Sequence, residues 1–339
     1  MKNSPIQIAV IGCGYWGPNL IRNFSQTAGV RISHLCDLDT KRLEHMKALY
    51  PHVQAERDYR KILKNPQIDA VAIATPASTH FAIAKAALSH NKDVLVEKPL
   101  ALRSSHAREL VALAKKQRRI LMVDHVYVYN SAVGKLREYV QKGELGKILY
   151  VHMDRLNLGL FRHDTNVVWD LCPHDLSVLD YVLGTKALSV QASGSSHYYR
   201  GKEEVAFAIL RYPKNILAHI HVSWIDPSKT RRIVVVGDKK MAIFDDLNDA
   251  EPLRIYDKGV VAHPHYESFG EFKLLYNWGD IVIPKVEIGE PLKIECQHFV
   301  ECVRQRQTPK TDGLAGLRIV NALEAIQTSL RKNGKTVMI

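Results

Sequence analysis

The chain is poor in cysteine and has no long apolar run. Its five cysteines among 339 residues are scattered, with no CxxC pair, at Cys13, Cys36, Cys172, Cys296 and Cys302. This usage favours neither a disulfide framework nor a zinc knuckle, so we expect no metal and a reducing, cytoplasmic location. The N-terminal MKNSPIQIAV lacks a signal-peptide core, and no stretch reaches the ~18 apolar residues of a membrane span. We therefore expect neither export nor a membrane partner.

Acidic residues are outnumbered, which gives a formal net charge of +12. Basic residues are nevertheless spread along the chain, and the densest cluster, KKQRR at 115–119, is short and has no interleaved aromatic residues. A basic balance by itself is weak evidence for nucleic-acid binding. The charge fits an anionic small-molecule substrate better, and we expect no nucleic-acid partner.

The length suits two domains, and the pattern of the chain changes near residue 126. Residues 1–126 alternate short apolar runs with helical segments, which predicts an α/β domain with a doubly wound parallel sheet of the Rossmann type. Residues 127–339 begin with a helix at about 131–142 and continue with long β-rich runs. They predict a second α/β domain with a large, mostly antiparallel open sheet, in which GDKK at 237–240 turns a hairpin.

A glycine-rich turn follows the first predicted strand. In IAVIGCGYWGPNL, Gly12 permits a tight turn, Gly14 lets backbone approach a pyrophosphate, and Gly17 lets the next helix pack closely on its strand. An ordinary strand-to-helix turn would also be glycine-rich. The context favours a dinucleotide site, because Asp37 ends the second predicted strand, where a carboxylate can accept hydrogen bonds from ribose hydroxyls.

The same carboxylate indicates which dinucleotide is bound. Asp37 would repel a 2′-phosphate, and Leu38 follows it in place of an arginine. We therefore predict NAD as the cofactor. Lys41 and Arg42 lie close by in the sequence and leave NADP possible.

Two further stretches carry candidate chemistry. In DVLVEKPLA, Glu97 and Lys98 end a strand of the parallel sheet, at the edge where such sheets bind ligands. A lysine there can stabilise negative charge on a substrate oxygen, although a surface lysine closing a strand fits the pattern equally well.

In NVVWDLCPHDLSVLDYVLG, Asp170 precedes His174 by four residues, and Pro173 indicates the first turn of a helix. This spacing places a carboxylate and an imidazole on one side, where the histidine can accept a proton from an alcohol near neutral pH. The alternative makes Asp170 a helix cap and His174 a solvated residue of the first turn.

Taken together, the blocks GCGYWG, ATPASTHFAIAKAAL, VEKPLA and WDLCPHDLSVLDYVLG, with Asp37, resemble the Gfo/Idh/MocA family of NAD(P)-dependent sugar and polyol oxidoreductases. The resemblance spans almost the whole chain. It implies a Rossmann domain followed by a substrate-binding α/β domain whose open sheet buries a face in homodimers or homotetramers.

The resemblance also implies roles for individual residues. Lys98 would lie near the nicotinamide and the reacting hydroxyl, and His174 would act as the acid or base. The cofactor would be lined by Gly12, Gly14, Tyr15, Trp16, Gly17, Asp37, Thr75, Pro76, His80, Glu97 and Lys98. Many members carry an aspartate three residues after the histidine, where this chain has Ser177. We predict Asp170, rather than Asp175, as the orienting partner of His174.

The stretch RLNLGLFRHDTNVVWDL resembles the branch that acts on nucleotide-activated amino sugars such as UDP-N-acetylglucosamine. That resemblance implies oxidation at C3 to a keto sugar, which a pyridoxal-phosphate aminotransferase would use in lipid A or surface-polysaccharide biosynthesis. Alternatives are a UDP-glucuronic acid derivative, a keto-deoxysugar nucleotide, a free polyol such as inositol, or a non-catalytic dinucleotide-binding regulator. We predict substrate contacts from donor side chains near the catalytic helix and at the entry to the second domain: Lys98, Tyr129, Arg155, Asn157, Arg162, Asn166 and His174.

Overall fold

The computed structural model describes residues 4–159, 161–162, 164–261, 275–287 and 289–339. The chain forms two compact units, one of residues 1–129 and 289–321 and the other of residues 130–288 and 322–339. The division expected from the sequence, 1–126 and 127–339, is contiguous. It does not include the return of residues 289–321 to the first unit.

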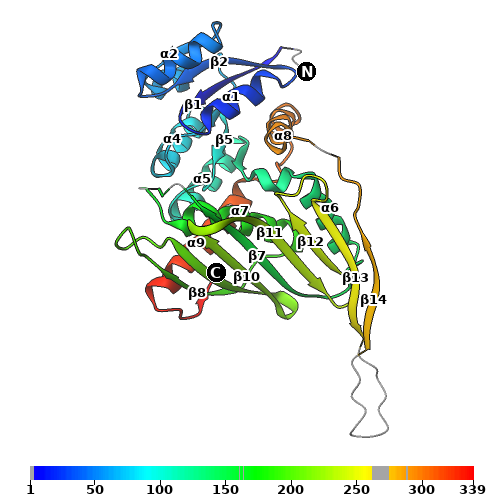
Figure 1. Ribbon diagram of the computed structural model, residues 1–339. Helices are drawn as coiled ribbons and strands as arrows, with labels where there is room; N and C mark the ends of the chain where they lie inside the picture. Colours follow the sequence, from blue (N-terminus) through cyan, green and yellow to red (C-terminus); the bar gives the residue numbers. More distant parts are fainter. Residues whose placement is uncertain (1–3, 160, 163, 262–274, 288) are drawn as a thin grey trace, which may run out of the picture. The chain divides into compact units, whose positions relative to one another are not determined.

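The first unit is built on a six-stranded parallel sheet (Figure 1). Its order is β3-β2-β1-β4-β5-β6, the order of a doubly wound dinucleotide-binding domain. The strands are β1 (Ile6–Ile11), β2 (Val30–Cys36), β3 (Gln54–Glu56), β4 (Ala70–Ile73), β5 (Asp93–Glu97) and β6 (Leu121–Asp124). Every residue of β4, β5 and β6 is buried, as expected where helices cover both faces of a parallel sheet.

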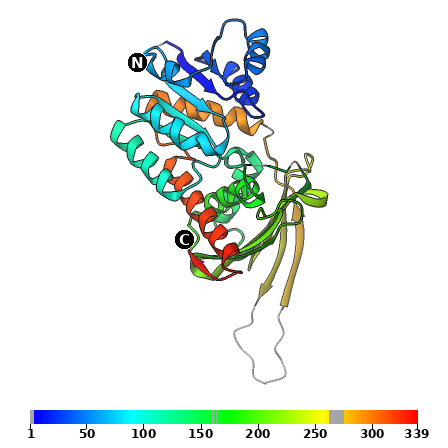
Figure 2. The same ribbon diagram turned by 90° about the vertical axis from the view of Figure 1, so that its left-hand side faces the viewer.

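The helices of this unit follow the strands in turn. They are α1 (Gly17–Ser25), α2 (Thr40–Leu49), α3 (Tyr59–Lys64), α4 (Ala77–Ser89) and α5 (Ser104–Gln117), with the 3₁₀ turn η1 (Val126–Tyr129) after β6. The returning segment adds α8 (Pro291–Gln305), which lies among the elements of this unit in Figure 2. α8 packs on α1 and η1, with Phe299 edge-on to Phe24 at 6.1 Å between ring centroids.

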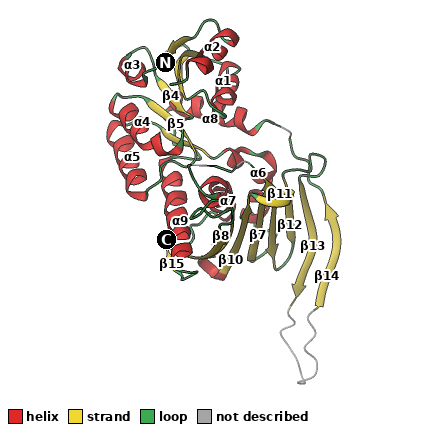
Figure 3. Ribbon diagram, turned by 60° about the vertical axis from the view of Figure 1, so that its left-hand side comes forward, coloured by secondary structure: helices red, strands yellow, loops and turns green. Residues whose placement is uncertain are grey.

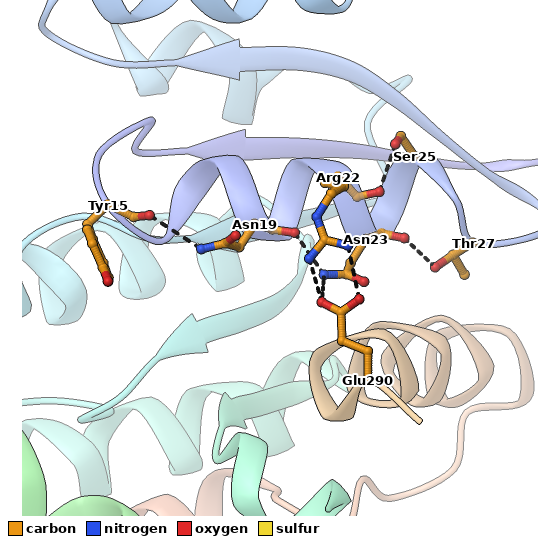
Figure 4. A network of polar contacts seen from close by, with 7 residues as sticks. All are labelled: Tyr15, Asn19, Arg22, Asn23, Ser25, Thr27 and Glu290. Atoms are coloured by element: carbon orange, nitrogen blue, oxygen red, sulfur yellow. Dashed lines mark hydrogen bonds and ion pairs between the residues drawn. The ribbon is translucent and has the colours of Figure 1, made fainter. Parts of the chain in front are cut away.

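A polar network fastens the start of α8 to α1 (Figure 4). Glu290, the residue before α8, accepts hydrogen bonds from the Arg22 guanidinium and the Asn23 amide, and both donors stand on α1. These bonds join residues more than 260 positions apart in the chain. They fix the place at which the returning segment enters the unit.

The second unit is built on a nine-stranded sheet, ordered β14-β13-β12-β11-β7-β10-β9-β8-β15 (Figure 3). All neighbours are antiparallel except β7 and β10, which confirms the mostly antiparallel sheet predicted from the sequence. The strands are β7 (Ile148–Leu158), β8 (Ser189–Ser195), β9 (Val205–Tyr212), β10 (Ile216–Ser223), β11 (Ile225–Gly237), β12 (Met241–Asp245), β13 (Leu253–Val261), β14 (Leu275–Val282) and β15 (Val337–Met338). The hairpin predicted at 237–240 joins β11 and β12.

One face of this sheet packs against helices. Those that contact the strands include α6 (Ser131–Gln141) against β12 and α7 (Val167–Leu183) against β9 and β10. The long helix α9 (Gly313–Arg331) spans the division between the units. Along β9 buried residues alternate with exposed Phe207, Ile209 and Arg211, as expected for a sheet with one free face.

The start of α7 corrects the sequence-based prediction. The helix begins at Val167, so Pro173 lies inside it rather than in its first turn. Asn166 caps the helix by accepting the Trp169 backbone N–H at 3.1 Å. Asp170 is therefore a residue of the first turn and not the cap. Among the helices of the described segments, none is long and apolar enough to span a membrane.

We expect Glu290→Gln to lower the stability of the chain at neutral pH by up to about 1 kcal/mol, the scale of a partly exposed ion pair. The Arg22 guanidinium, helped by Asn23, lowers the pKa of Glu290 from 4.5 to about 2. A lowered pKa in the folded state gives stability that is present above the unfolded-state value and lost as pH falls toward the folded-state value. The stability difference from wild type should therefore shrink as the pH falls through and below 4.5.

Urea denaturation near pH 7 and near pH 3 measures this difference, because most of the loss falls between the two pKa values. Glu44→Gln, at an exposed position of α2, is the matched control for removing one carboxylate from a helix of this unit. A difference between wild type and Glu290→Gln that stays constant with pH would contradict the assignment.

Candidate functional site

The glycines after β1 form a turn with no room for side chains at two positions. A Cβ on Gly17 would stand 2.0 Å from the Gly12 carbonyl oxygen, and one on Gly12 would stand 2.5 Å from the Ala74 carbonyl oxygen. Gly12 also has φ of +102°, which L side chains rarely adopt. Gly14 differs, because its Cβ would meet only the Arg42 guanidinium, at 3.4 Å. Gly14 is thus not required by packing, which suits a position where backbone approaches a ligand.

The Asp37 carboxylate is hydrogen-bonded to the backbone of this turn. Its Oδ2 accepts the Cys13 backbone N–H at 2.7 Å, and its Oδ1 accepts the Asp39 backbone N–H at 2.8 Å. Arg42 lies 4.0 Å from the same carboxylate. The carboxylate is therefore oriented by the turn itself, and each oxygen keeps further acceptor capacity for a ribose hydroxyl.

The helix after the turn has its N-terminus free of side-chain caps. Trp16 occupies the cap position of α1, and no side chain there accepts a hydrogen bond from the helix. Tyr15 is 81% exposed and packs edge-on against Trp16 at 5.8 Å between ring centroids. An uncapped helix N-terminus beside a glycine turn fits the pyrophosphate of a dinucleotide, so these residues suit NAD.

His80 connects two loops at the same edge of the sheet. Its Nε2 lies 2.9 Å from the Thr75 carbonyl oxygen, and its Nδ1 lies 2.8 Å from the Pro99 carbonyl oxygen. His80 is 1% exposed, whereas Pro76 beside Thr75 is exposed. The imidazole thus braces the loop that carries Lys98, a half-buried residue directly after the buried Glu97.

In the second unit, α7 carries Asp170 and His174 one helical turn apart. The Trp224 indole N–H donates to Asp170 Oδ2 at 3.2 Å, and Arg162 Nη1 lies 3.7 Å from Asp170 Oδ1. Trp224 is buried, while the Asp170 side chain is 16% exposed. This carboxylate is therefore oriented from outside the helix by an indole and a guanidinium.

Asp175 forms a buried ion pair with Arg155. Arg155 donates to it from both Nε and Nη2, at 2.9–3.2 Å, and both side chains are buried. Burial raises the pKa of Asp175 in spite of the guanidinium. Ser177, which stands where many members of the resembled family have an aspartate, donates to the His174 backbone carbonyl at 2.7 Å. The role of Asp170 in orienting His174 stays a prediction.

Of the other residues predicted to contact substrate, Asn166 and Tyr129 are buried, whereas Asn157 and Arg162 are more exposed. Asn166, besides capping α7, donates from its amide to Glu203 and to Gln327. Tyr129 is buried in η1, where its hydroxyl lies 3.3 Å from Thr311 Oγ1. Asn157 on β7 is half-buried, and Arg162 is exposed. Residues 160 and 163, which belong to the same predicted stretch, lie outside the described residues.

Sequence reasoning missed the tertiary partners of these groups. Trp224 follows β10 and is 54 residues from Asp170, so no local pattern links the two. The Arg155–Asp175 pair joins β7 to α7 across 20 residues. The available signal was that Arg155 continues the alternation of Val151 and Met153 on the inward face of β7. An arginine at such a position is rarely buried unless it is paired.

The parallel sheet, the glycine turn and the acid after β2 define an NAD-binding domain of a dehydrogenase. Comparison with known families agrees: residues 6–125 match the oxidoreductase family with an NAD-binding Rossmann fold, and residues 133–243 match the GFO/IDH/MocA C-terminal domain. The chain belongs to the Gfo/Idh/MocA family of oxidoreductases, which act on sugar hydroxyls.

Known relatives extend the likeness. The uncharacterized oxidoreductase YdgJ of Escherichia coli is 30% identical over 69% of this chain and 69% of its own length. UDP-N-acetylglucosamine 3-dehydrogenase of Acidithiobacillus ferrooxidans is 25% identical over 78% of this chain and 79% of its own length. A structure of the latter, GnnA, superimposes with a TM-score of 0.80 at 23% identity, covering 96% of this chain and 98% of that one.

We predict that Gly14→Ala keeps the fold and weakens NAD binding tenfold or more, because the added methyl stands where backbone would approach the pyrophosphate. Gly17→Ala should instead lower thermal stability, because its Cβ would overlap the Gly12 carbonyl oxygen. Calorimetric titration with NAD and thermal unfolding of both variants measure the two effects. Gly134→Ala on α6, where a Cβ meets nothing within 4 Å, is the control. Unchanged NAD affinity in Gly14→Ala would contradict the proposed path of the cofactor.

Proposed function

We propose that the protein is an NAD-dependent dehydrogenase that oxidises a secondary hydroxyl, at C3, of a nucleotide-activated amino sugar such as UDP-N-acetylglucosamine. The observation that carries this proposal is that Asp170 and His174 stand one turn apart on α7, with Asp170 oriented by Trp224. The relative from Acidithiobacillus ferrooxidans supports the substrate class, since its name states that activity. A net charge of +12 suits a diphosphate substrate.

The roles proposed for the chain's own residues follow from their chemistry. His174 accepts the proton of the sugar hydroxyl, and Asp170 stabilises the imidazolium that forms. Lys98 donates a hydrogen bond to the reacting oxygen and favours negative charge on it. NAD, when bound in the first unit, would supply the hydride acceptor. Asp37, with both oxygens already oriented, binds the adenosine ribose and favours NAD over NADP.

Substrate contact is proposed for Arg162, which is exposed and lies 3.7 Å from the Asp170 carboxylate, and for the half-buried Asn157 on β7. For Arg155 and Asn166 we propose a supporting role, because their polar atoms are bonded to Asp175, Glu203 and Gln327 within the unit. The keto sugar that such a reaction releases is a substrate for amine transfer, so a pyridoxal-phosphate aminotransferase is the proposed consumer. A cytoplasmic location follows from that partnership.

The free face of the nine-stranded sheet supports a homodimer or homotetramer. It carries large apolar side chains that are 37–47% exposed, on β7, β9 and β10: Tyr150, Phe207, Ile209 and Leu217. Contiguous exposed apolar side chains mark interaction surfaces. Sedimentation equilibrium should give twice or four times the mass of one chain, and Ile209→Asp should shift the mass toward one chain. A monomeric wild type would contradict this proposal.

The function is tested by turnover of UDP-N-acetylglucosamine with NAD, and separately with NADP, following reduced nicotinamide at mildly alkaline pH with an amine that traps the ketone. Signal with NAD is expected, and product analysis fixes the carbon. His174→Asn should lower kcat by about 100-fold or more, the scale of general base catalysis, with NAD affinity unchanged. His90→Asn, at the exposed end of α4, is the control.

Three outcomes would change the proposal. Tight NAD binding with no turnover of the nucleotide sugar, but turnover of glucose or myo-inositol, would move the substrate to free sugars. Full activity in His174→Asn would remove its role as the base. NADP preferred over NAD would overturn the argument from Asp37.

A further inference from the structure

Three carboxyl groups lie buried together behind Lys98 in the first unit. Glu97 ends β5 and Asp124 ends β6, and the two are direct partners in the register of these parallel strands. Glu295 comes from α8, in the segment that returns to this unit. The three are 6%, 4% and 0% exposed. The Asp124 carboxyl lies close enough to both glutamates to raise the pKa of each, and Glu97 also raises the pKa of Glu295.

The surroundings supply too few donors for three carboxylates. Among the described residues, no hydrogen-bond donor reaches either oxygen of Glu295 or Oε1 of Glu97 in good geometry. The backbone N–H groups of His125 and Lys98 lower the pKa of Glu295 and of Glu97, respectively, by less than the Asp124 carboxyl raises it. A buried carboxylate oxygen without a donor is costly, whereas a protonated carboxyl supplies its own.

The charged and titratable groups around the cluster do not neutralise three negative charges. Burial lowers the pKa of His125 to about 3, so this imidazole is neutral. Burial also raises the pKa of Tyr129 and of Cys296, which keeps both neutral. Among the described residues, Lys98 is the cation that lowers the pKa of Glu97, while Arg318 acts on the neighbouring His125. Burial and then the Asp124 carboxyl raise the pKa of both Glu97 and Glu295 well above the usual value.

We propose that Glu97 and Glu295 are protonated at neutral pH and each donate a hydrogen bond to an ionised Asp124, so that the three groups carry a single negative charge behind Lys98. Two shared contacts need two protons, and three carboxyls holding two protons retain one charge. Glu295 and Asp124 are then positioning residues: they act through Glu97 on the charge and placement of Lys98. The role of Lys98 in this scheme rests on the proposed function.

The proposal predicts opposite results for two isosteric variants. Glu295→Gln replaces a protonated acid by a neutral donor of the same shape, so the single charge stays and the pH–rate profile should match wild type. Asp124→Asn removes the negative charge that favours the protonated form of Lys98. The alkaline limb of the pH–rate profile, where Lys98 would lose its proton, should therefore move to lower pH by about one unit, the scale of a nearby opposite charge. Glu295→Ala removes the hydrogen-bond donor to Asp124, so its pH–rate profile should differ from that of Glu295→Gln.

An infrared difference spectrum at neutral pH between wild type and Glu295→Gln tests the protonation without any sugar. The expected difference is loss of the carbonyl stretch of a protonated carboxylic acid. Loss of a carboxylate stretch would overturn the proposal, as would a Glu295→Gln profile shifted like that of Asp124→Asn. So would an unshifted profile in an Asp124→Asn variant that folds and binds NAD. If the wild type oxidises no tested sugar, the proposed function fails, and the spectrum still decides the state of Glu295.

Discussion

The carboxyl edge of the six-stranded parallel sheet is the constraint on which the first unit depends. Because all six strands run the same way, the residues that follow them reach one edge, wherever they stand in the sequence. Gly12 follows β1, Asp37 follows β2, and Thr75 follows β4, while Glu97 and Asp124 end β5 and β6. The glycine turn, the acid predicted to bind the ribose, the loop before α4 and the lysine after β5 thus belong to one place in the fold.

Each candidate group at that edge is held by an acceptor or donor from another loop. Asp37 accepts a hydrogen bond from the backbone N–H of Cys13, and His80 joins the Thr75 carbonyl before α4 to the Pro99 carbonyl directly after Lys98. The same pattern recurs in the second unit, where Trp224 orients Asp170. A polar side chain held in this way loses little further conformational freedom when a ligand binds, which is the physical advantage of a preorganised site.

The buried acids show how the returning segment bears on the chemistry of the first unit. Glu290 enters as a charged group, with donors on α1 that favour its ionised form. Glu295, one turn into α8, meets carboxyls in place of donors, and burial favours its protonated form. Two glutamates five residues apart thus have pKa values shifted in opposite directions, because one meets hydrogen-bond donors and the other is buried beside carboxyls.

The sequence by itself determined the parallel sheet, the glycine turn, the acid after β2 and the open antiparallel sheet. These features are written in local periodicity and in residues whose backbone conformation is restricted, such as Gly12. The same local evidence placed the start of α7 wrongly, because Pro173 is typical of a first turn, whereas the residue that caps the helix is Asn166. Only the tertiary structure decided that Arg155 pairs with Asp175, that Trp224 donates a hydrogen bond to Asp170 and that residues 289–321 return to the first unit. Those contacts join residues 20 or more positions apart, and burial with the exclusion of water, rather than local pattern, selects such partners.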